Sequence, residues 1–166
     1  MYHNSNESNL PPTLSALPHA VAIIKGSPSH RRIAGTVKFY EAKDGVLIVA
    51  DITGLPTSAQ ACKERIFGFH IHGGGACTGN AEDPFADAGT HFNPHGCEHP
   101  YHAGDLPPLF GAKGRAFLAF LTNRFTVSEI IGKAVILHDR PDDFTTQPAG
   151  NAGNKIACGV ISRVPR

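Results

Sequence analysis

At 166 residues, the chain is long enough for a single domain with one hydrophobic core. Its 18 glycines, 13 prolines and charged fraction of only 17% suit short strands joined by turns and ordered loops, and they exclude a helical bundle. The net charge is +1 and the chain has no basic run, so we expect no binding to nucleic acid or to an anionic membrane surface.

The chain begins with a polar, proline-containing stretch, residues 1–18, that lacks the basic start and continuous apolar run of a signal peptide. We therefore expect a flexible tail at 1–18, one domain at 19–166 and a cytoplasmic location, with a secreted or cell-surface location left open. No apolar stretch approaches the ~20 residues that a membrane span needs, so the sequence predicts none.

The first half of the domain consists of predicted strands. Residues 20–26 form a short apolar run, and residues 32–56 contain two β-rich runs on either side of Lys43-Asp44-Gly45. Asp-Gly is a hairpin signal, so we expect a hairpin there with its return strand at 46–52. The apolar run 65–72 predicts the next strand.

The second half alternates long loops with strands. Residues 73–114 are rich in glycine, proline and histidine and show no sustained periodicity, which is typical of an ordered, functional loop. After it we expect a strand at 115–122, a single helical turn leading into a buried strand at 126–139, a second glycine-rich loop at 140–155 and a last strand at 156–164. Some seven or eight short strands and almost no helix predict an all-β fold, a Greek-key β-sandwich or flattened barrel of antiparallel strands with long metal-binding loops.

Two histidines one residue apart, His70 and His72, lie in the predicted strand 65–72. Side chains alternate across a strand, so both imidazoles project to one face while Phe69 and Ile71 project to the other. Two neutral imidazoles on one face suit a transition metal. The alternative is a pair of surface histidines on a half-exposed strand.

The long loop supplies further metal-ligand residue types. His99, His102 and Asp105 follow one another at three-residue steps, after His91. Three imidazoles and one carboxylate close a tetrahedral zinc site with no open position, which is the structural rather than the catalytic pattern. Spacing alone does not decide whether His95 or His99 is the ligand.

His138 stands alone at the end of the buried strand predicted within 126–139. A single strand-end histidine is more often structural than a ligand. Together with His70, His72 and the second nitrogen of His91, however, it completes a set of four nitrogens, and nitrogen-rich tetragonal coordination favours copper.

At this point the sequence resembles the copper/zinc superoxide dismutase family, in a short-loop, bacterial-like form. The resemblance covers residues 19–166 and rests on six motifs in order: "GFHIH", "CTG", "GTHFNP", "HAGDL", "GKAVILHDRPDD" and "GNAGNKIACGVI". It implies a Greek-key β-sandwich, copper and zinc as cofactors, and an enzyme that converts superoxide to dioxygen and hydrogen peroxide.

The resemblance also implies a role for each site residue. The family interval favours His99 over His95 as a zinc ligand, and it makes His91 a bridge between the metals that also delivers a proton in catalysis. The implied ligands are His70, His72, His91 and His138 for copper, and His91, His99, His102 and Asp105 for zinc.

Two further residues take family positions outside the ligand sets. Asp142 resembles the carboxylate that accepts hydrogen bonds from one ligand of each metal. The alternative interpretation of Asp142 is an exposed acidic residue in a loop. Lys155 stands where the family usually has an anion-guiding arginine; it keeps the charge but lacks the planar fork of donors. We therefore expect an active enzyme that orients the superoxide anion less well than it would with an arginine at this position.

The four cysteines form no C-x-x-C pair, which argues against a structural zinc–thiolate site. The resemblance implies a disulfide between Cys77 and Cys158. Cys62 and Cys97 lie outside the family pattern, and either a second bridge or two free thiols would fit. Disulfides are unusual in the cytosol, so they conflict mildly with the missing signal peptide.

Two other functions compete with the enzyme. A non-catalytic copper-binding, storage or chaperone-like protein on the same fold should lack a copper ligand, and a zinc hydrolase needs an open zinc position. The expected partners are superoxide as substrate and a copper-delivery protein. A homodimer is left open, with no interface assigned.

Overall fold

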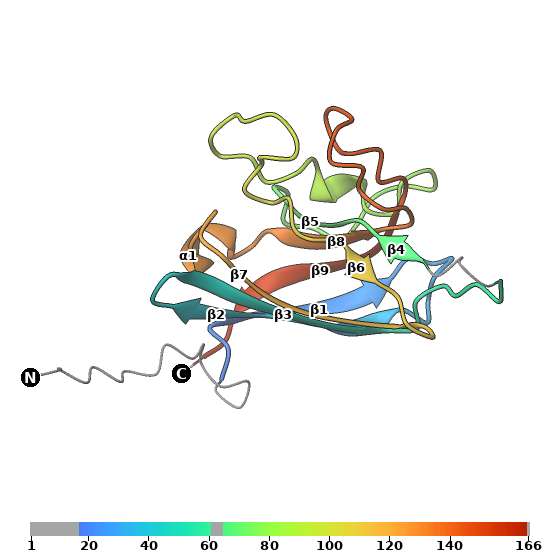
Figure 1. Cartoon of the computed structure of the whole chain (residues 1–166), viewed down its shortest axis with the longest axis horizontal. Helices are drawn as coiled ribbons and strands as arrows, with labels where there is room; N and C mark the ends of the chain where they lie inside the picture. The colour runs from blue at the N-terminus through green and yellow to red at the C-terminus, as the bar shows by residue number, and fades with distance from the viewer. Residues whose placement is uncertain (1–16, 61–64, 166) are drawn as a thin grey trace, which may run out of the picture.

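Figure 1 shows the computed structural model, which describes residues 17–60 and 65–165. Its main feature is a curled antiparallel sheet in the order β5-β8-β9-β1-β2-β3-β7, which confirms the predicted all-β fold. The neighbouring pairs β5–β8, β9–β1 and β3–β7 are not consecutive in the sequence, and such crossovers are typical of a Greek key. The strands are β1 (Ala20–Gly26), β2 (Ala34–Ala42), β3 (Gly45–Thr53), β5 (Phe69–His72), β7 (Arg115–Thr122), β8 (Ala134–His138) and β9 (Lys155–Arg163).

The hairpin between β2 and β3 forms where the sequence predicts it, but its turn differs in detail. Ala42 pairs with Gly45, so the turn itself is Lys43 and Asp44. Gly45 opens the return strand with a φ of 141°, a conformation that favours glycine. The strand is therefore slightly longer than the predicted 46–52.

The predicted strand 65–72 is in fact divided at Gly68 into β4 (Ile66–Phe67) and β5. The Gly68 N–H donates to the carbonyl of Arg140, and a Cβ at this position would lie 2.9 Å from the Cβ of Ala152. The division thus results from close packing of the second loop against the strand.

The loop predicted at 73–114 contains two short elements that the sequence did not indicate. These are a 3₁₀ turn, Ala86–Ala88, and β6 (Leu109–Phe110), which pairs with β4. A two-residue strand is too short to show periodicity. The predicted helical turn is present as α1 (Val127–Ile130), and Glu129 accepts a hydrogen bond of 2.7 Å from the Thr126 N–H before it.

The two faces of β5 and β8 have different environments. Phe69 and Ile71 on β5 belong to the main hydrophobic core, inside the curl of the sheet. The opposite face of these strands lies beneath the long loops, which Figure 1 shows above β5 and β8. A second apolar cluster forms there around the Cys77–Cys158 disulfide, with Phe85 and Ile136. The loops are therefore fastened over this outer face.

The predicted tail, residues 1–18, falls almost wholly outside the described residues. Within the described residues, no helix is long and apolar enough to cross a membrane.

Candidate metal centre

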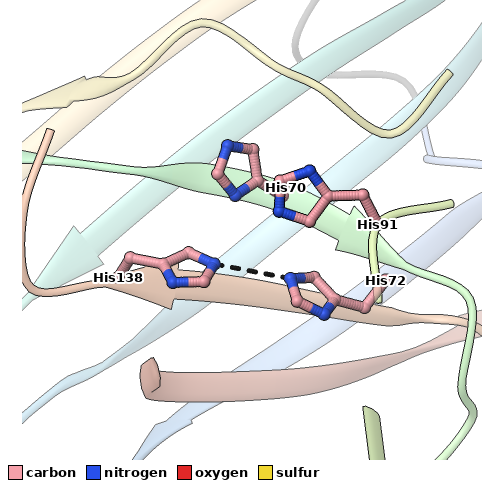
Figure 2. Close-up of side chains that lie close together, drawn as sticks. All are labelled: His70, His72, His91 and His138. Atoms are coloured by element: carbon pink, nitrogen blue, oxygen red, sulfur yellow. Dashed lines mark hydrogen bonds between the residues drawn. The ribbon is translucent and has the colours of Figure 1, made fainter. Parts of the chain in front are cut away.

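Four histidines converge on the outer face of β5 and β8 (Figure 2). His70 and His72 lie on β5 and His138 ends β8, while His91 comes from the loop. An isolated bridge between His72 and His91 holds that part of the loop against β5. One nitrogen from each ring lies within 4.8 Å of the others. We call these four residues the first donor group.

A second donor group adjoins the first and shares His91 with it. Its ligand atoms also lie within 4.8 Å of one another, and its members are His91, His99, His102 and Asp105. The Asp105 carboxylate lies 2.7 Å from His91 Nδ1 and 3.1 Å from His99 Nδ1. A second isolated bridge, between His70 and Asp105, holds this part of the loop against β5. The structure thus brings His99 into the group and leaves His95 exposed.

Hydrogen bonds determine which nitrogen of each ring can bind a metal. His72 Nδ1 donates to the carbonyl of Gly89 at 2.8 Å, and His138 Nδ1 donates to that of Gly153 at 3.3 Å. Both Nε2 atoms then carry lone pairs, yet they lie only 3.4 Å apart (Figure 2). Facing lone pairs repel, and a cation beside both nitrogens would remove the repulsion.

Three buried ring nitrogens in the described residues lack a hydrogen-bond partner: His70 Nδ1, His91 Nε2 and His99 Nδ1. Leaving a buried polar atom unpaired costs about 1–3 kcal/mol. All three belong to the donor groups, so a metal ion in each group would satisfy them. The residues present therefore fit both a nitrogen-rich ion such as copper and a zinc ion with three imidazoles and a carboxylate.

Burial keeps two of these histidines neutral. It lowers the pKa of His72 to about 2 and that of His138 to about 3, and the neighbouring histidines add to both shifts. At neutral pH both imidazoles are therefore uncharged, which is the form that binds metals.

Asp142 connects the two donor groups. Its carboxylate accepts hydrogen bonds from His70 Nε2 at 2.7 Å and from His99 Nε2 at 2.9 Å. Burial alone would raise its pKa, but these bonds and one from the Phe144 N–H lower the pKa to about 2. Asp142 is only 5% exposed, so the alternative of an exposed loop acid is wrong.

A pocket of about 390 Å³ opens over the shared edge of the groups, lined by His72, His91, His138 and Lys155 among others. The Lys155 ammonium lies 2.5 Å from Asp83 Oδ2 and donates to the carbonyl of Phe85. The side chain is thus restrained at the pocket wall rather than free in solvent.

Two of the contacts made with site residues have no signal in the sequence. Asp83 is 72 positions from Lys155 and lies in a different loop. Gln147 binds the backbone of His99 from both sides, because its Oε1 accepts from the His99 N–H and its Nε2 donates to the His99 carbonyl. Only the folded loops bring these pairs together.

The Cys77–Cys158 disulfide is present, with its Cα atoms 5.6 Å apart, as the resemblance implied. Cys97 is exposed and free, and Cys62 lies outside the described residues.

Taken together, an antiparallel β-barrel fold and two adjoining donor groups that share one histidine define a class of protein: a β-barrel protein with a two-metal centre. The family model for copper/zinc superoxide dismutase matches residues 33–161. The chain belongs to this family, which confirms the predicted enzyme class and the copper and zinc cofactors.

Individual relatives agree with the family model. The chain is 35% identical over 144 residues to Cu-Zn superoxide dismutase 2 of Aquifex aeolicus, covering 78% of this chain and 79% of the relative. It is 30% identical over 151 residues to a Cu-Zn superoxide dismutase of Deinococcus radiodurans, covering 80% and 79%. A crystal structure of a double mutant of a SOD-like protein from Bacillus subtilis matches with a TM-score of 0.70 and 31% identity, covering 88% of this chain and 98% of that one.

Proposed function

We propose that this chain dismutes superoxide at a copper ion held by the first donor group, with zinc held by the second. The observation that carries the proposal is the shared ring of His91. Its Nδ1 faces Asp105 in the second group, while its Nε2 is buried without a hydrogen-bond partner and the residue lines the pocket. One imidazole can therefore serve both groups.

Copper, when bound, would supply the one-electron chemistry, so that one superoxide leaves as dioxygen and the next as hydrogen peroxide. The residues would supply protons and orientation. His91 Nε2 is the atom to which we assign the proton delivered to the peroxide, because no hydrogen bond competes for it. Asp142 and the carbonyls of Gly89 and Gly153 hold the rings around the metal in one tautomer.

Zinc would be structural. Three imidazoles and a carboxylate saturate a tetrahedral ion and leave no position for a substrate or water. This argues against the zinc hydrolase alternative. The complete set of four nitrogens and the pocket above it argue against a copper store.

Lys155 would attract the anion, since its ammonium lies on the wall of the pocket that reaches the first donor group. Asp83 restrains it and cancels part of its charge. For the location, the disulfide favours an oxidising compartment over the cytoplasm.

The test is cyanide-sensitive removal of superoxide by protein loaded with copper and zinc. His138→Ala removes one nitrogen of the first group, and we expect it to abolish the activity. His95→Ala is the matched control, because His95 lies in the same loop region as the donors but is exposed and outside both groups. Equal activity of the wild type and His138→Ala would disprove the proposed centre.

A further inference from the structure

Arg124 lies in the turn between β7 and α1 and belongs to neither donor group. Its guanidinium Nη1 donates to three backbone carbonyls: those of Pro100 at 3.1 Å, His102 at 3.2 Å and Asp105 at 3.0 Å. All three belong to the segment 99–105, which also carries three members of the second donor group, namely His99, His102 and Asp105.

The segment 99–105 has no helix or strand of its own to hold it. Within the segment the His102 carbonyl accepts a hydrogen bond of 3.2 Å from the Asp105 N–H, and the other carbonyls need partners from elsewhere in the fold. Nη1 carries only two hydrogens for three acceptors, so the segment must curl around this one atom. Hydrogen bonds from an ionised donor are about twice as strong as neutral ones, which makes this a firm restraint.

The restraint acts directly on metal-binding residues. The carbonyls of His102 and Asp105 are one bond from the Cα atoms that carry the ligand side chains, so holding these peptide planes also fixes the directions of both side chains. At the other end of the segment, Gln147 holds the backbone of His99. Side chains from outside the segment thus hold each of its three donor residues.

We propose that Arg124 is a positioning residue for the second donor group, one that sets its affinity for zinc. This inference rests on the proposed zinc site. Arg124 touches no donor atom; it acts through the backbone of the segment 99–105.

Arg115 provides the matched control for an ordinary surface arginine. It lies on β7, is exposed, and forms a bidentate pair with Asp51 at 2.9 and 2.7 Å. That pair is on the sheet, away from the segment 99–105. Replacing Arg115 removes an arginine and its hydrogen bonds without releasing the loop.

The experiment titrates copper-loaded, zinc-free protein with Zn²⁺ in competition with a chelator. A parallel titration uses Co²⁺, whose visible absorption reports a tetrahedral site. We expect Arg124→Met to bind Zn²⁺ about tenfold more weakly than the wild type. This is the lower end of the loss of metal affinity that follows when a residue that holds a metal ligand in place is replaced. Arg115→Met should bind like the wild type.

The outcomes separate the two claims. If the wild type binds no Zn²⁺, or if Asp105→Ala binds as well as the wild type, both the zinc site and the role of Arg124 are wrong. If the wild type binds and Arg124→Met binds equally well, only the role of Arg124 is wrong, even if its melting temperature falls.

Arg124→Lys decides the matter if Arg124→Met does not fold. Lysine keeps the charge but replaces the planar fork with a single ammonium, so it should hold fewer of the carbonyls. We expect it to lose several-fold in Zn²⁺ affinity, and an affinity equal to that of the wild type would overturn the inference.

Discussion

The two donor groups share His91 but are built on different parts of the fold. In the first group, three of the four histidines lie on β5 and β8, where strand pairing sets their positions. All members of the second group come from the long loop: His91, His99, His102 and Asp105. Two isolated bridges hold this loop against β5. The side chains of Asp142, Gln147 and Arg124 hold its donor residues through hydrogen bonds.

This difference indicates how each site should respond to substitutions and to destabilisation of the fold. Strand positions depend on the cooperative sheet, so the three strand histidines of the first group should keep their geometry until the domain unfolds. Loop positions depend on a few individual hydrogen bonds, so the second group should lose affinity while the sheet remains intact. Asp142→Ala tests this contrast directly. Variants of the disulfide, Lys155 and Asp83 test the surroundings of the two groups, and the expected effects decrease in the order disulfide, Asp142, Lys155 and Asp83.

Removing the disulfide should have the largest effect. Cys77 and Cys158 are 81 residues apart, so the Cys77→Ser/Cys158→Ser double variant should lower the free energy of unfolding by about 3–4 kcal/mol, because the unfolded chain gains freedom. Denaturant unfolding of the metal-free protein measures this. The exposed, free Cys97 provides the control, and Cys97→Ser should unfold like the wild type. A loss below about 1 kcal/mol would show that the bridge constrains little.

Asp142→Ala should weaken both metal sites, but unequally. It removes the acceptor of His70 on the sheet and of His99 in the loop, so we expect Zn²⁺ affinity to fall about 30-fold and copper affinity about tenfold. Competition titrations with each ion measure the two losses. Asp143→Ala removes a neighbouring carboxylate that accepts from Thr145 and Thr146 instead, and it should change neither affinity much. A larger loss of copper affinity than of zinc affinity would contradict the contrast between sheet and loop.

Lys155→Ala should lower the second-order rate with superoxide about tenfold at low ionic strength, because the pocket loses its cation. Lys155→Arg should raise the rate, since a planar fork orients a small anion better. Stopped-flow or pulse-radiolysis rates at several salt concentrations measure both effects. An unchanged rate for Lys155→Ala at low salt would mean that this residue does not guide the substrate.

Asp83→Asn should have the smallest effect, a rise in the rate of about twofold at low salt. The amide keeps an acceptor for Lys155 but leaves the ammonium charge uncompensated. The increase should disappear at high salt, where the charge is screened. Asp87→Asn is the control. It removes a carboxylate charge from the same loop, where Asp87 accepts a hydrogen bond from Thr78, and it should change the rate less than Asp83→Asn does. A lower rate for Asp83→Asn would mean that the restraint on Lys155 matters more than its charge.

The same contrast explains what could be predicted from the sequence. Strand periodicity is local, so it correctly indicated that His70 and His72 share a face opposite Phe69 and Ile71. In the loop, spacing did not separate His95 from His99; only the family resemblance favoured His99, which is the one the structure buries.

The contacts that complete the centre were beyond sequence reasoning, since they join distant loops. Asp83 and Lys155, Gln147 and His99, and Arg124 with the segment 99–105 are each brought together only by the fold. The break at Gly68 has the same origin, because it results from packing against the loop that contains Ala152.

The central claim is that one imidazole serves two metal ions. Anomalous diffraction at the copper and zinc absorption edges, from crystals of the protein loaded with both ions, tests it most directly. We expect a copper peak beside His70, His72 and His138, a zinc peak beside Asp105, and the ring of His91 between the two. A map in which His91 contacts neither ion, or in which His138 turns away from the copper peak, would contradict the account.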